Sequence, residues 1–229
     1  MESASQQPHS LEIWLHDVQS YIYKLTSGPM NHGGFHFNRS EFTYSRKNKK
    51  SHDKLSIIFL TQFPVKFRVS FQLEIWHPQI KHIKESFISE ILTRESNLCS
   101  VILYMKDFPS NDTQMEIVKD YSIYDYKDLF MAGDWLARTL QYELVPLCDQ
   151  LSSLENMDRF FEAKPGWSLD THSGGNICTD LIVSKLVRKR DFHQRYQQLM
   201  EGLKCRIENR QINPECRELL ALCYETIRE

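Results

Sequence analysis

Apolar and polar residues alternate along residues 35–77, and this alternation is the clearest pattern in the chain. A period of two predicts consecutive antiparallel strands joined by short turns. In the most regular strand, apolar residues from Phe67 to Ile75 occupy every second position, with polar residues between them. The run 55–62 is apolar on both faces through its middle, which predicts a central strand covered on each side.

Helical periodicity flanks these strands. Apolar residues recur at intervals of three and four after Ser10, which can cap a helix, and the Gly-Pro pair at 28–29 predicts its end. Pro78 suits the first turn of a second helix. Strand-like runs follow at 99–105 and 115–124, and we expect these two strands to pair with each other.

The second half of the chain predicts helices. A long helix is expected over 126–151, with Pro146 as its kink or early end. A short helix is expected over 154–163, and a later one begins at Thr179 or Asp180. Early strands followed by late helices predict an α+β fold. It comprises an N-terminal helix, a mostly antiparallel twisted sheet of about four to six strands packed by helices, and an all-helical C-terminal half.

This pattern divides the chain into an α+β sheet region, residues 1–124, and a helical region, residues 125–229, packed on the sheet as one compact domain. Hydrophobic residues make up 41% of the chain and charged residues 25%, which indicates an ordinary globular protein rather than a disordered one.

The cysteines and the lengths of the apolar runs indicate where in the cell the protein is expected to act. Six cysteines are scattered without a CxxC pair, and the N-terminal residues lack the pattern of a secretory signal. These features predict reduced cysteines in a cytoplasmic protein. The apolar runs are shorter than the roughly 18 residues of a membrane span, so we expect no membrane partner.

One basic cluster stands out although the formal net charge is only −2. With so small a net charge, contact with an anionic partner must depend on a local patch. At a hairpin tip the cluster suits phosphate groups or an acidic protein surface, and it equally suits a solvated turn that prevents edge-to-edge pairing. The candidate contact residues are Arg46, Lys47, Lys49, Lys50 and Lys54.

Acidic residues gather later, between Asp107 and Asp134, where seven carboxylates accompany two lysines. Their spacing does not match a calcium-binding loop, so we interpret them as a solvated face. Together with the basic cluster they make the charge distribution of the chain dipolar.

Motifs for catalysis and metal binding are absent from the sequence. The loop 172–176 (His-Ser-Gly-Gly-Asn) precedes a helix but has neither a P-loop nor a nucleophile-elbow signature, and we interpret it as a connector. The histidines lack metal-ligand spacing, and His77 continues the parity of Ile75, which predicts a buried structural residue. We therefore predict no catalytic, metal-binding or cofactor-binding residue and no cofactor.

Three segments carry a resemblance to a known family. They are Gly34-Phe35 with the strand through Phe42 and Arg46, the strand 71–75 leading into a helix, and the segment 181–186 with Asp191-Phe192 and Tyr196. Together, over about half the chain, they resemble the bacterial family named domain of unknown function 4304. This chain departs from the family by a long loop before Gly34 and an extra helix at 205–229. The resemblance implies the α+β fold and no site residues.

The sequence is compatible with three functions. The dipolar charge and the missing motifs favour a non-enzymatic cytosolic interaction or accessory protein, for example an immunity-like component of a bacterial system. Such a protein would contact a protein partner through its sheet and charged surfaces. The first alternative is nucleic-acid or nucleotide binding through the basic hairpin at 46–54. The second is an enzyme with a site near the 172–176 loop.

Overall fold

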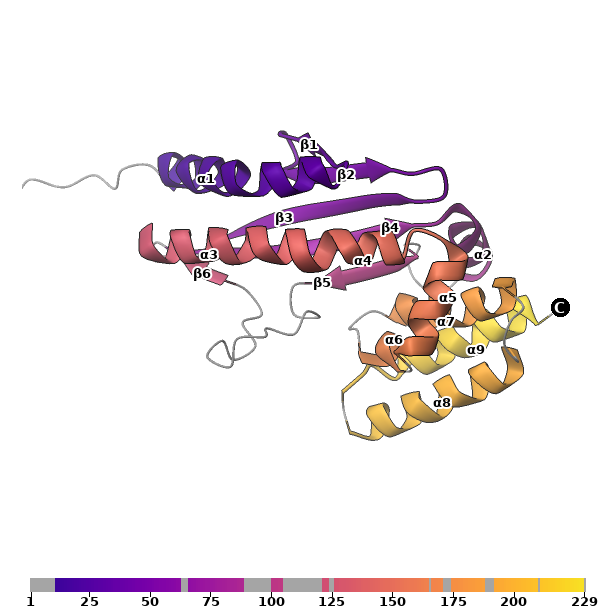
Figure 1. The fold of residues 1–229 in the computed structure, drawn as a ribbon. Helices are drawn as coiled ribbons and strands as arrows, with labels where there is room; N and C mark the ends of the chain where they lie inside the picture. The colour runs from indigo at the N-terminus through magenta and orange to yellow at the C-terminus, as the bar shows by residue number, and fades with distance from the viewer. Residues whose placement is uncertain are drawn as a thin grey trace, which may run out of the picture.

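The computed structural model confirms the α+β fold: an N-terminal helix, an antiparallel sheet and a helical C-terminal half follow one another (Figure 1). The residues that the structure describes are 11–62, 66–88, 100–104, 121–123, 126–164, 166–170, 174–187, 192–209 and 211–228. Within these ranges, no helix is both long and apolar enough to cross a membrane.

Among the described residues the sheet has six antiparallel strands, and β1 to β5 follow one another in sequence order. The strands are β1 (His36–Asn38), β2 (Thr43–Lys47), β3 (His52–Gln62), β4 (Lys66–Trp76), β5 (Val101–Tyr104) and β6 (Tyr121–Ile123). The expected pairing of the two late strands is wrong, because β5 and β6 each pair with β4. The strand β4 is long enough to bond β5 along residues 72–75 and β6 along residues 67–69.

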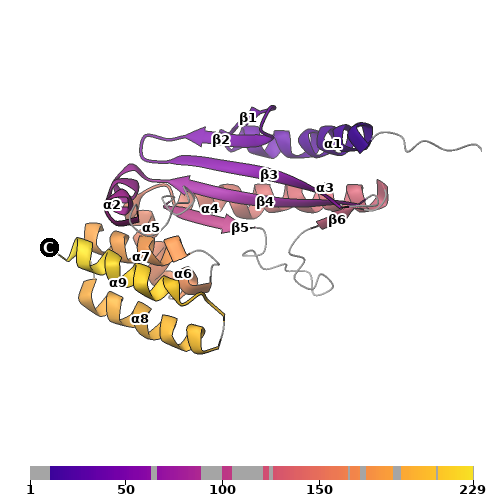
Figure 2. The same cartoon turned by 180° about the vertical axis from the view of Figure 1, so that it is seen from behind.

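The helices form two groups. They are α1 (Leu11–His32), α2 (Pro78–Ile88), α3 (Tyr126–Thr139), α4 (Val145–Gln150), α5 (Leu154–Ala163), α6 (Trp167–Asp170), α7 (Gly174–Val187), α8 (Phe192–Glu208) and α9 (Glu215–Ile227). Helices α1, α3 and α4 cover one face of the sheet, whereas α5 to α9 gather beyond its β5 edge (Figures 1 and 2). A single hydrophobic cluster extends from α1 and the sheet to α9.

The alternating strand β4 supplies the centre of the core, as the sequence predicted. Its apolar side chains, from Phe67 to Ile75, are all buried against α1 and α3. Phe71 is fully buried, and the indole of Trp135 on α3 stacks on its ring with the centroids 6.3 Å apart. The period of two therefore identified both the strand and the face that it buries.

The opposite face of the sheet is open, so the prediction that β3 is covered on both sides is wrong. Ile57 is buried in the core, but Ile58 is only half-buried and Leu60 is 45% exposed. No helix of the described residues lies over this face (Figure 2). An antiparallel sheet can keep one face in water, and the four-residue apolar run does not distinguish that arrangement from a covered strand.

Helix α1 continues past the predicted stop at residues 28–29. Pro29 lies inside the helix, where it lacks the N–H that would donate to the preceding turn. The extra turn places Met30 in the core, where it is 1% exposed, and the N–H of Gly33 donates to the Pro29 carbonyl at 3.0 Å. Burial of Met30 offsets the lost hydrogen bond.

The predicted long helix over 126–151 is continuous but changes its winding before Pro146. A π-helical turn, Leu140–Leu144, separates α3 from α4, and Val145 donates its N–H to the carbonyl of Leu140. Pro146 then stands in the first turn of α4, where the missing N–H costs least. The proline is thus accommodated by the π-turn without ending the helix.

Helix α7 begins at Gly174, five residues before the predicted cap. Thr179 and Asp180 lie inside the helix and are fully buried, so neither is a cap. Thr179 donates its hydroxyl to the Ser100 carbonyl, and Asp180 forms an ion pair with Arg195 of α8. Both side chains join helices to their neighbours, which explains polar residues in a buried segment.

Candidate functional site

The basic cluster lies on a hairpin tip, as expected. Strands β2 and β3 pair up to Lys47 and His52, and the N–H of Asn48 donates to the Ser51 carbonyl at 2.8 Å across the turn. The tip stands at the same end of the sheet as α2 and α5 (Figure 1). A single turn therefore brings the basic residues beside the start of two helices.

Arg46 is separate from the other cations, and we remove it from the candidate contact residues. Its guanidinium is buried and donates to Asp53 at 2.9 Å, to Asp149 of α4 at 2.8 Å and to the Gly33 carbonyl at 3.0 Å. The same group lies over the Phe35 ring, 4.7 Å from its centroid. Arg46 thus joins the hairpin to α1 and α4.

Asp53 completes this internal ion pair. It is fully buried, with its carboxylate also accepting a hydrogen bond from Ser51 at 3.2 Å. Burial raises the pKa of Asp53, and the hydrogen bond and charge of Arg46 oppose that rise. Burial alone would lower the pKa of Arg46, but Asp53 reverses the effect and raises it. Asp53 therefore balances the charge of Arg46 inside the protein and does not pair with the exposed lysines.

The four lysines divide between two surfaces. Lys47 and Lys54 lie on the strands and share the parity of the open face of the sheet, where Lys54 is 3.5 Å from the carboxylate of Glu41. Lys49 and Lys50 are exposed at the tip and line a pocket. The structure thus brings together two of the five sequence-predicted residues.

The hairpin-tip pocket, as we name it, has a volume of about 310 Å³. Three segments line it: the tip with Lys49 and Lys50, residues 77–79 with the start of α2, and Leu154 and Glu155 at the start of α5. The first turn of a helix has backbone N–H groups without intrahelical partners and a partial positive charge. Pro78 at the start of α2 has no N–H, and the N–H of Asn156 in α5 already donates to Ser153, so the helices contribute mainly through their dipoles. Two helix dipoles and two ammonium groups therefore favour an anion in this pocket.

His77 adds a hydrogen-bonding group to the wall of the hairpin-tip pocket. Its side chain is buried, with the residue 6% exposed, and its Nδ1 atom has no hydrogen-bond partner within the described residues. Its backbone N–H donates to Ser100 at 2.6 Å, which fixes the residue. A buried polar atom without a partner is costly unless a ligand or water satisfies it.

Burial and the neighbouring charges shift the pKa of the His77 side chain. Burial lowers the pKa of His77, the charge of Glu155 opposes this effect, and the charge of Lys50 adds to it. The parity of β4 predicted that His77 is buried, and this is confirmed. That His77 lines a pocket depends on α5, a helix far away in the sequence, and no local signal indicates it.

Glu155 opposes an anion at the rim of the hairpin-tip pocket. Its carboxylate is 3.9 Å from the Lys50 ammonium, and both side chains are more than half exposed. Exposed pairs of this kind contribute about 0–1 kcal/mol, so Lys50 can leave Glu155 for a ligand at little cost.

The 172–176 loop does not form a site in the part that the structure describes. His172 and Ser173 lie outside the described residues, and Gly174–Asn176 belong to α7 instead of a connector. The Asn176 side chain accepts from the Ile102 N–H at 2.9 Å and donates to the Ile102 carbonyl at 2.8 Å. These bonds fix α7 to the edge strand β5, which is a structural role.

The acidic segment falls mostly outside the described residues. Within it, Asp134 of α3 forms an ion pair with Arg138 at 2.9 Å on the helix surface. No group of three or more histidine, cysteine or acidic residues suited to a metal ion occurs among the residues that the structure covers.

Comparisons with models of protein families, with curated proteins and with solved structures find no match. The resemblance to the domain of unknown function 4304 stays a prediction from the sequence. The function must therefore be inferred from the site.

Proposed function

We propose that this protein is a non-enzymatic binding protein that holds the phosphate group of a nucleotide or nucleic acid in the hairpin-tip pocket. The observation that carries the proposal is the convergence of Lys49, Lys50 and His77 at the starts of α2 and α5. The two ammonium groups and a protonated His77 interact favourably with an anion, and so do the positive ends of the two helix dipoles.

Anion binding and protonation of His77 are linked. In the free protein, burial lowers the pKa of His77, so the ring is neutral near pH 7. An anion in the hairpin-tip pocket, beside His77, favours the protonated ring and raises that pKa. By linkage, lowering the pH must tighten anion binding.

Sulfate is a suitable probe because it stays doubly charged where histidine titrates. We expect its affinity to increase by about threefold to tenfold as the pH falls from about 7.5 to about 5.5. In a His77→Asn variant, which retains a hydrogen-bonding group but does not titrate, the affinity should be nearly constant. Isothermal titration calorimetry in a chloride buffer of fixed ionic strength measures both proteins.

A wild type that does not bind sulfate contradicts the proposal, and so does an equal pH dependence in His77→Asn. A mononucleotide and an oligonucleotide without terminal phosphates then distinguish the two sources of the phosphate group. An oligonucleotide contacting several cations shows an affinity that decreases steeply with salt, whereas one phosphate in the pocket gives a shallow dependence.

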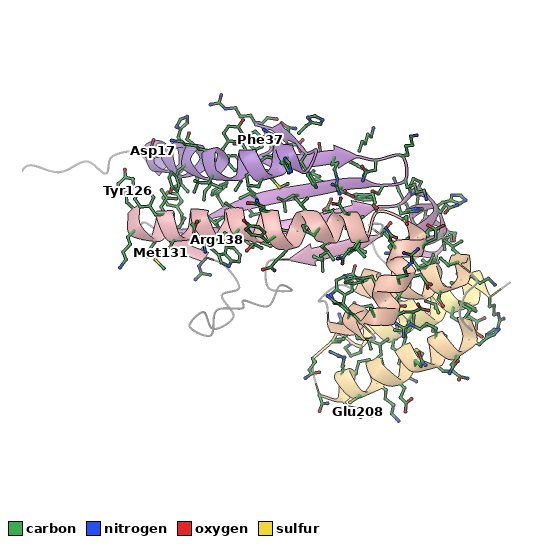
Figure 3. The ribbon with its side chains drawn as sticks, in the orientation of Figure 1. Asp17, Phe37, Tyr126, Met131, Arg138 and Glu208 are labelled. Atoms are coloured by element: carbon green, nitrogen blue, oxygen red, sulfur yellow. The ribbon has the colours of Figure 1, made fainter. Side chains whose placement is uncertain are left out.

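A protein partner, the leading expectation from the sequence, is the second candidate. Tyr126, Phe130 and Met131 at the start of α3 are 55%, 53% and 47% exposed. Figure 3 shows Tyr126 and Met131 at the outer end of this helix. Aromatic residues and methionine are enriched in protein interfaces, and exposed apolar clusters often mark them.

This second candidate predicts that a protein retained from extracts of the source cells by the immobilised wild type is lost with Phe130→Ser/Met131→Ser. Removing the buried apolar area of two anchors should weaken binding by about tenfold or more. Tyr142→Ser is the matched control, since Tyr142 is 69% exposed outside this cluster. Equal retention by all three proteins contradicts a partner at this surface.

A further inference from the structure

A second hollow, of about 450 Å³, lies between α1 and the turn that joins β1 to β2. We name it the Phe37 groove, and Figure 3 marks Phe37 beside α1. Strand β2 begins at this turn and ends at the hairpin tip, so the groove and the hairpin-tip pocket lie at opposite ends of one strand. The two sites therefore share no lining residue.

Aromatic rings form the floor of the Phe37 groove. The Phe37 ring is half-buried and lies 4.5 Å from the Tyr23 ring, with an interplanar angle of 31°. Phe42 meets Phe37 edge-on with the centroids 5.1 Å apart. Tyr23 is 41% exposed, so ring surface remains accessible in the groove. Such a floor favours a flat aromatic ligand, which can stack or pack edge-to-face.

The backbone of Phe42 is strained where it enters the groove wall. Its φ is +52°, and it is the one non-glycine residue with a positive φ in the described ranges. For a bulky residue this conformation costs roughly 1–2 kcal/mol. In this strained conformation Phe42 lines the groove, and its ring packs on Phe59 with the centroids 4.8 Å apart. Strained residues of this kind cluster at ligand-binding sites.

The rim of the Phe37 groove is polar and carries a positive charge. His16, Gln19 and Ser20 line it from α1, at the spacing of one helical face. Arg39 lines it from the turn, is exposed and makes no ion pair or hydrogen bond within the described residues. The turn itself is fixed, because the Asn38 side chain accepts from the N–H of Ser40 at 3.1 Å.

We propose that the Phe37 groove binds an aromatic anion. The ligand ring packs on the exposed part of Tyr23 beside Phe37, and its carboxylate or sulfonate pairs with the guanidinium of Arg39. A quaternary ammonium ligand also suits aromatic walls, but the described lining of the groove contains no carboxylate to balance its charge. The charge of the rim therefore selects an anion.

Two ligands of the same shape test this proposal: naphthalene sulfonate and its neutral alcohol analogue, naphthalenemethanol. Calorimetry or ligand-observed NMR on the full chain should show that the sulfonate binds roughly fivefold to tenfold more tightly than the alcohol. Arg39→Gln should remove this preference and retain the affinity for the alcohol. Arg159→Gln, another exposed arginine, on α5, is the matched control and should keep the preference.

Equal affinities of the two ligands for the wild type overturn the proposal, as does an unchanged preference in Arg39→Gln. The variant Lys49→Glu/Lys50→Glu should bind naphthalene sulfonate as the wild type does. If it does not, the ligand occupies the hairpin-tip pocket, and the assignment to the Phe37 groove is wrong. Circular dichroism of each variant verifies that the fold is retained.

Discussion

Arg46→Met is expected to lower the free energy of unfolding by about 3–5 kcal/mol, because it leaves the carboxylate of Asp53 buried without a counter-ion. Asp53 is fully buried, and its only ion-pair partner in the described residues is Arg46, at 2.8 Å. The substitution also removes the bonds from Arg46 to Gly33 and Asp149, which join the hairpin to α1 and α4. Urea unfolding followed by circular dichroism measures the loss.

The double variant Arg46→Met/Asp53→Leu separates the unpaired charge from the lost packing. Replacing both partners with apolar residues should recover most of the stability, since the cost is mainly that of an isolated buried charge. Acid should also reduce the deficit of Arg46→Met. Burial already raises the pKa of Asp53, and loss of Arg46 raises it further, so protonation at low pH neutralises the buried group in the folded state. A deficit below about 1 kcal/mol, or one independent of pH, contradicts this account.

The sequence predicted best those elements that local periodicity determines. The parity of β4 identified its buried face, Pro78 stands where α2 begins, and the short helix expected over 154–163 is α5. The prediction from sequence was wrong where contacts between residues distant in the chain determine where a helix begins or ends. Helix α1 continues past Pro29 because Met30 is buried in the core. Thr179 is buried in the middle of α7, where its hydroxyl donates to the carbonyl of Ser100, the residue before β5.

The candidate site shows the same division. Parity places Arg46 with Tyr44 on the buried face of β2, yet its position in a basic cluster favoured an exposed role. Its partner Asp149 is 103 residues away in the sequence, so only the fold reveals the ion pair. The lysines at the tip could be predicted as a basic turn, whereas the contribution of α5 to the hairpin-tip pocket could not.

The largest effect on binding is expected from Lys49→Glu/Lys50→Glu. This change replaces two attractive charges in the hairpin-tip pocket with two repulsive ones, and we expect a decrease in sulfate affinity on the order of a hundredfold. Glu155→Gln should have the opposite effect, because it removes the carboxylate that competes for Lys50. Its expected gain is several-fold, in keeping with about 0–1 kcal/mol for an exposed pair.

The control must change the charge of the whole protein equally. Lys47→Glu/Lys54→Glu reverses two lysines on the same hairpin, outside the hairpin-tip pocket, and gives the same net charge. Any difference between the two double variants therefore reports the pocket and not the overall field of the protein.

The most direct test is a sulfate titration of these three variants and the wild type at one pH and ionic strength. We expect that Lys49→Glu/Lys50→Glu loses binding, that Lys47→Glu/Lys54→Glu binds within about threefold of the wild type, and that Glu155→Gln binds more tightly. If the two double variants lose affinity equally, or if Glu155→Gln binds more weakly than the wild type, the anion is not held in the hairpin-tip pocket.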